Sequence, residues 1–189
     1  NNELFADKYA TALSWCVDFL CDQSAINGSR WFGVIDPERV GMLGHSIGAS
    51  AAALAAATDV RVRALALLSP VETHPSPVSA IEKCHVPVLL LASPEDIAQG
   101  LKGVTSPMYD AVAPPKQLHL LHNGSSQFFP DGMLLGHRHR RQLKDTQLTL
   151  LGFFDTYLRD AKLSLAPPPK PGAAGAAGGV AGGGATGGG

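Results

Sequence analysis

The sequence predicts an α/β fold in which helices alternate with the strands of a parallel sheet. Residues 86–92 form an uninterrupted apolar run, as expected of a strand in a parallel sheet covered on both faces. Residues 4–21 and 144–159 instead carry apolar side chains at helical spacing. Between them, helical segments alternate with apolar runs of strand length, an order that favours parallel strands joined by right-handed crossovers.

The periodicity places four strands and four helices along the chain. The expected strands span residues 39–43, 62–68, 86–92 and 118–121. The expected helices span residues 4–21, 47–57, 78–83 and 144–159. The apolar stripe of the first helix consists of Phe5, Tyr9, Leu13, Cys16, Val17 and Leu20. The inward residues of the last helix are expected to be Leu150, Leu151, Phe154 and Leu158.

The composition indicates one globular domain followed by a tail. The chain has 189 residues and is 45% apolar, enough for a substantial core. We expect the domain to occupy residues 1–165. Residues 166–189 consist almost entirely of Pro, Gly and Ala, with little charge and nothing large to bury, so we expect this tail to be disordered.

Several function classes lack support in the sequence. The formal net charge is −1, and the one basic cluster, residues 137–141, has no interleaved aromatic residues, so we expect no nucleic-acid binding. No signal peptide or apolar span of transmembrane length is visible. There is no phosphate-binding glycine loop, zinc ligand set or cofactor motif, so we expect no cofactor or metal. Cys16, Cys21 and Cys84 are interpreted as buried, reduced thiols.

The most informative motif is Gly-His-Ser-Ile-Gly at residues 44–48, between an apolar run and an alanine-rich run. This order predicts that Ser46 lies on a sharp turn from a strand into a helix, in a strained backbone conformation that exposes its hydroxyl. We expect side chains at Gly44 and Gly48 to collide in so tight a turn. The helix N-terminus behind Ser46 favours developing negative charge. The alternative is an ordinary strand-to-helix turn with a buried serine.

Gly-x-Ser-x-Gly in this setting resembles the nucleophile elbow of α/β-hydrolases. Residues 34–54 are most similar to the serine esterase branch, which includes dienelactone-hydrolase-like, chlorophyllase-like and cutinase-like polyester hydrolases. The resemblance covers roughly residues 4–162 and implies the C-terminal portion of that fold, with about four parallel strands and the early strands missing. It therefore implies a fragment, or a domain whose strand at 39–43 is an exposed sheet edge that needs the missing N-terminal half or a partner strand.

The resemblance also implies a chemistry, the hydrolysis of a small-molecule or lipid-like carboxylic ester through an acyl-enzyme at Ser46. The backbone N–H of Ile47 would be one oxyanion donor, while the second would come from an earlier loop. Asp96 occupies the position of the acid, just past the strand at 86–92; the alternatives are a turn-capping role for Asp96 and a substitute acid, Glu72.

The base is the missing part of the implied triad. The family places a histidine in a Gly/Ser-rich turn after the last strand, where this chain has Ser125 or Gln127, neither of which is a general base near neutral pH. His122, about three residues earlier, is the first substitute, and His137 and His139 are further candidates. We therefore expect an incomplete triad and weak ester hydrolysis.

Two other function classes remain open from the sequence. One is a hydrolase-like protein without catalytic activity, used for binding or as a scaffold, which the missing histidine and the missing half of the expected sheet favour. The other is a related amide or thioester hydrolase or a peptidase, because the motif does not determine the leaving group.

Overall fold

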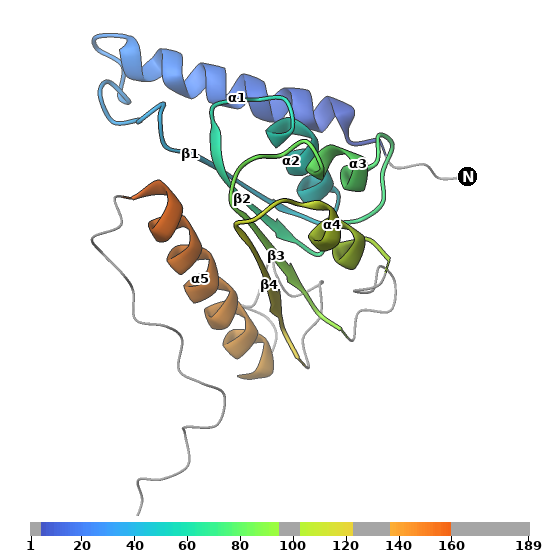
Figure 1. Ribbon diagram of the computed structural model, residues 1–189. Helices are drawn as coiled ribbons and strands as arrows, with labels where there is room; N and C mark the ends of the chain where they lie inside the picture. Colours follow the sequence, from blue (N-terminus) through green and yellow to red (C-terminus); the bar gives the residue numbers. More distant parts are fainter. Residues whose placement is uncertain (1–4, 95–102, 123–136, 160–189) are drawn as a thin grey trace, which may run out of the picture.

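The computed structural model describes residues 5–94, 103–122 and 137–159, and it confirms the parallel α/β fold (Figure 1). One sheet contains all four strands in the order β1-β2-β3-β4, and each neighbouring pair is parallel. The strands are β1 (Val40–His45), β2 (Val62–Leu68), β3 (Val88–Ala92) and β4 (Lys116–Leu120). Because all four run the same way, their carboxyl ends meet at one edge, where sites of open α/β sheets form.

Helices cover both faces of the sheet. They are α1 (Asp7–Ala25), α2 (Ile47–Ala56), α3 (Pro77–Ile81), α4 (Thr105–Ala111) and α5 (His137–Leu158). Helices α1 to α4 lie on one face and α5 lies on the other (Figure 1). The sequence did not lead us to expect α4, a seven-residue helix with a proline in its first turn.

The side chains of the two central strands separate into two apolar clusters, one on each face. Leu65 and Leu90 belong to the cluster under α1 to α4. Leu89 and Leu91 belong to the cluster under α5, together with Phe153. All four leucines are completely buried. The continuous apolar run of β3 therefore reflects burial on both faces, as the sequence predicts for a central parallel strand.

The expected inward stripes of the two long helices are partly wrong. On α1, Val17 is buried but Tyr9 remains 58% exposed, and Phe5, which lies before the start of α1, is 54% exposed. Among the elements of the fold, α1 packs chiefly against α2. On α5, Leu151 is 58% exposed while Phe153 is 3% exposed. The buried stripe of α5 therefore passes through position 153, and position 151 lies away from it.

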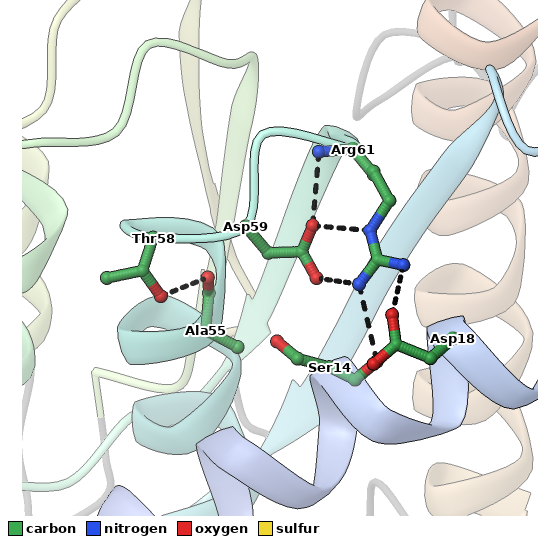
Figure 2. A network of polar contacts seen from close by, with 6 residues as sticks. All are labelled: Ser14, Asp18, Ala55, Thr58, Asp59 and Arg61. Carbon is green, nitrogen blue, oxygen red and sulfur yellow. Dashed lines mark hydrogen bonds and ion pairs between the residues drawn. The ribbon is translucent and has the colours of Figure 1, made fainter.

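An ionic network fastens α1 to the turn between α2 and β2 (Figure 2). The Arg61 guanidinium donates to both carboxylate oxygens of Asp59, at 2.8 and 2.7 Å, and also pairs with Asp18 of α1. The side chain of Asp59 is only 6% exposed, and its hydrogen bonds with Arg61 lower the pKa of its carboxyl. The network holds α1 beside the sheet through charge-assisted hydrogen bonds.

The cysteines are free thiols, as expected, but they are not all buried. Cys16 is exposed and Cys21 is intermediate, which corrects the expectation that all three lie in the core. Cys84 is buried, and this burial raises the pKa of its thiol to about 11. Within the described ranges, no helix is long and apolar enough to cross a membrane. The expected tail lies outside those ranges.

Candidate functional site

Ser46 occupies the turn between β1 and α2, at the carboxyl edge of the sheet. Its backbone has φ 56° and ψ −124°, so the expectation of a strained backbone at a strand-to-helix turn is confirmed. The Ser46 N–H donates to the carbonyl of Leu68 at the end of β2, at 2.9 Å. An L-residue rarely adopts this conformation, and such strain is typical of functional sites.

The two glycines of the motif differ in what they do. A Cβ on Gly44 would overlap the backbone of Gly48 and lie 2.6 Å from the Ala49 nitrogen, so only glycine fits the close approach of β1 to α2. At Gly48 a Cβ would meet nothing within 4 Å. The expectation of a collision is therefore correct for Gly44 and wrong for Gly48, because Gly48 lies in the first turn of α2 facing open space.

A second strained serine stands beside Ser46. Ser69 follows the end of β2 with φ 43°, and Ser46 and Ser69 are the non-glycine residues with positive φ in the described ranges. The register pairs His45 with Leu68, so the two serines occupy equivalent positions past adjacent strands. Ser69 is 7% exposed, and its hydroxyl has no hydrogen-bond partner among the residues that the structure describes.

Helix α2 points its N-terminus at the turn. Ile47 is its first residue, so the Ile47 N–H belongs to the group of donors at a helix start that lack intrahelical acceptors. The helix is alanine-rich and packs against β1 and β2 with six of its ten residues buried. This close packing places the positive end of the helix dipole next to Ser46, where it favours an anion.

An open apolar groove of about 410 Å³ adjoins the turn. Its helical wall belongs to α1 and includes Tyr9, Leu13 and Cys16. The other wall is the end of β1 and the first turns of α2, including His45 and Ile47, whereas Ser46 between them is not a lining residue. Among the described residues, the lining contains no Asp, Glu, Lys or Arg and one histidine, His45, so the groove suits a largely apolar group.

The expected acid lies outside the described residues. Asp96 follows β3 in sequence, but the structure describes the chain only as far as residue 94 before resuming at 103. The substitute acid, Glu72, is described and exposed, in the segment that follows β2. The assignment of Asp96 therefore stays a prediction.

The expected bases are also mostly outside the described residues. His122 is described, exposed, and located two residues after the end of β4. His137 and His139 fall in the first turn of α5, but their side chains are not among the described parts of the structure. The segment that contains Ser125 and Gln127 also lies outside the described residues. Among the expected site residues that the structure describes, the nucleophile Ser46 and the oxyanion donor Ile47 lie together, and these two are neighbours in sequence.

Sequence reasoning missed one histidine–carboxylate pair. Nε2 of His119 on β4 lies 3.1 Å from the Asp145 carboxylate on α5. Strands in a sheet are about 4.8 Å apart, so β4 lies about 14 Å from β1, too far for this pair to reach Ser46. The pair links α5 to the far strand.

Comparison with known proteins identifies a family. A family model for PET hydrolase-like proteins matches residues 6–136, more than half of the chain. No curated protein matches the sequence. Among solved structures, the esterase domain of a Rhodothermus marinus protein is similar, with a TM-score of 0.46 and 16% sequence identity. That match covers 58% of this chain, and the chain spans 57% of the matched esterase chain.

Proposed function

Because the chain belongs to the PET hydrolase-like family, we propose that it provides the nucleophile of a serine-dependent carboxylic-ester hydrolase. The observation that carries the proposal is the backbone of Ser46, with φ 56° between a parallel strand and a helix N-terminus. The Ser46 hydroxyl attacks the ester carbonyl, the alcohol leaves, and an acyl-enzyme forms. Water then attacks the acyl group and releases the acid and free Ser46.

The Ile47 N–H supports the tetrahedral intermediate as one oxyanion donor. It directly follows the nucleophile and lies at the positive end of α2. The second donor has to come from another segment beside β1. Removal of one donor costs about 10²–10³ in rate, so the site is expected to work slowly with Ile47 alone.

Asp96 is the proposed acid, and the strand order supports it. β3 is two strands from β1, which corresponds to about 10 Å and leaves room for an imidazole between acid and nucleophile. His122 follows β4, which lies about 14 Å from β1. To act as the base for Ser46, its imidazole would have to reach back past the ends of β3 and β2. The turn with Ser125 and Gln127 has no imidazole, and the proposed hydrolase is therefore impaired.

Residues 1–165 form the hydrolase portion in this proposal, and residues 166–189 are a separate tail. β1 pairs only with β2 among the described strands, so its outer edge is available to the remaining part of a hydrolase fold or to a partner strand. The substrate is a small or lipid-like ester, which agrees with the uncharged groove beside Ser46.

The groove also favours a second candidate function, a hydrolase-like binding protein without catalysis. An apolar groove of about 410 Å³ binds an uncharged ligand whether or not a base is present. A related amide or thioester hydrolase or a peptidase would use the same serine, since the turn does not select the leaving group.

Labelling with a fluorophosphonate, followed by peptide mass spectrometry, tests the nucleophile directly. We expect one adduct, on Ser46, that is absent in Ser46→Ala and present in Ser79→Ala, a control on the exposed face of α3. Turnover of p-nitrophenyl acetate should be slow and lost in Ser46→Ala. Gln127→His should not restore a full rate, because the proposal identifies one oxyanion donor, the Ile47 N–H, among the described residues.

Each other outcome separates the candidates. Absence of any adduct would reject the hydrolase and favour the binding protein. An adduct on another serine would reject Ser46. Rapid turnover abolished by Ser46→Ala would show that the triad is complete, and His122→Ala and His137→Ala would then identify its base.

A further inference from the structure

A completely buried serine, Ser50 of α2, lies one helical turn after Ser46. Its hydroxyl makes two hydrogen bonds with a single residue of the segment that follows β2. The Ser50 Oγ donates to the Val71 carbonyl at 2.5 Å and accepts from the Val71 N–H at 3.2 Å. One hydroxyl thereby satisfies both backbone polar groups of a buried residue.

These bonds complete a closed ring of contacts around the turn. The Ser46 N–H is bonded to the Leu68 carbonyl, and the Ser50 N–H is bonded to the Ser46 carbonyl at 3.3 Å. The segment after β2 is thus attached to the turn at Leu68 by Ser46 and at Val71 by Ser50. Between the two attachments lies Ser69, with its positive φ.

Strained residues keep their conformation only where the surrounding structure over-determines it. In this ring, hydrogen bonds at Leu68 and Val71 join the segments of two strained residues on adjacent strand ends, and the Ser69 N–H itself donates to the Leu91 carbonyl of β3 at 2.8 Å. Without the Ser50 hydroxyl, Leu68 would be the one remaining link of the ring between the turn and the segment after β2. Both polar groups of Val71 would also lose these partners inside the protein, which favours movement of the segment.

The surroundings of Ser50 show that its hydroxyl, and not its volume, is what the fold requires there. Its neighbours Ala49, Ala51, Ala52 and Ala53 are all buried, so α2 packs on the sheet with methyl side chains. Alanine at position 50 would fit the same space. The hydroxyl has a use only in the bonds to Val71.

We propose that Ser50 is a positioning residue, which holds the strained turn of Ser46 against the segment after β2. This inference rests on the proposed role of Ser46 as nucleophile. The expected consequence follows from the sensitivity of nucleophilic attack to geometry, since a displacement of about 1 Å can reduce a rate about 10²-fold.

The test compares Ser50→Ala with Thr146→Val, a control that removes a buried hydroxyl without a described partner from α5. Three quantities are measured: the rate of Ser46 labelling by fluorophosphonate, and the hydrogen exchange rates of the Val71 and Ser46 amides by NMR. In Ser50→Ala we expect faster exchange at both amides and labelling slowed about 10- to 100-fold, with the far-ultraviolet circular dichroism unchanged. In Thr146→Val all three quantities should stay within about twofold of wild type, as for a distant, independent site.

Two results would overturn the inference. In the first, Val71 exchanges faster in Ser50→Ala while the Ser46 labelling and exchange rates stay at their wild-type values, so that Ser50 only stabilises the segment. In the second, Thr146→Val slows labelling as much as Ser50→Ala does. Should Ser50→Ala not fold, Ser50→Cys keeps the space filled with a weak hydrogen-bonding group, and an unchanged labelling rate there would equally reject the role.

The inference can be judged separately from the proposed function. Wild-type protein that is never labelled at Ser46 would reject the nucleophile. The Ser46 amide would then decide the positioning role alone: faster exchange in Ser50→Ala supports it, and unchanged exchange overturns it.

Discussion

Strands β1 and β3 are both apolar in sequence but differ in their environment. All five residues of β3 are buried, whereas in β1 only Met42 is buried and Leu43 is 51% exposed. β3 has a strand on each side, while β1 has only β2 among the described strands. The difference teaches that the centre of this sheet provides the stability, and the less buried edge strand carries the strained turn of the candidate site.

The largest expected difference between the two strands concerns burial. Leu90→Ala in β3 removes a completely buried side chain and should lower the free energy of unfolding by about 2–5 kcal/mol. Leu43→Ala in β1 should cost less than about 1 kcal/mol, because half of that side chain already contacts water. Urea denaturation followed by circular dichroism measures both, and equal losses would show that β1 is as deeply packed as β3.

A second pair of variants addresses the turn at the end of β1. Gly44→Ala should destabilise the protein by about 1–3 kcal/mol, because the added Cβ overlaps the backbone of α2. Gly48→Ala meets open space within a helix and should be neutral or stabilising by up to about 1 kcal/mol. Thermal unfolding of the two variants gives the comparison. A destabilised Gly48→Ala protein would mean that the turn requires both glycines.

The ionic network makes a smaller, pH-dependent contribution at the other end of β2. Since the pKa of Asp59 is lowered in the folded protein, the stabilisation is complete above the unfolded pKa of about 4 and is lost as the pH falls through the folded value. Asp59→Asn should therefore cost about 1–2 kcal/mol at pH 7 and progressively less in acid. Asp18→Asn, at a side chain 55% exposed, should cost less than about 1 kcal/mol. A loss for Asp59→Asn that does not depend on pH would contradict the ionic explanation.

The last prediction concerns the outer edge of β1, which has no partner among the described strands. We expect the smallest change in stability there, but a measurable change in self-association. Unpaired strand edges with apolar side chains promote association. The isolated chain is expected to self-associate in light scattering, and Leu43→Lys should shift it toward the monomer with a change in stability of less than about 1 kcal/mol. A wild-type chain that is monodisperse as a monomer would show that the edge needs no covering.

Much of the fold could be predicted because local patterns agree with the tertiary structure. The apolar run at 62–68 became β2 with the same bounds, and the positive φ of Ser46 followed from the strand, glycine and helix order around it. The role of Gly48 could not be predicted, because whether a Cβ collides depends on the direction of α2 relative to β1. Ser50 escaped notice because a serine within an alanine run shows no partner until the segment after β2 is placed beside it.

The sequence by itself determined the parallel α/β class, the position of the strained serine and the absence of a histidine between Asn123 and Phe128, since these depend on residue type and local spacing. The tertiary structure alone decided which apolar residues are buried, so that Phe153 lies in the core while Tyr9 and Leu151 remain exposed. It also decided the ring that joins Ser46, Leu68, Val71 and Ser50. The reason is physical: burial and long-range hydrogen bonds depend on which segments become neighbours, and residue spacing describes only one segment at a time.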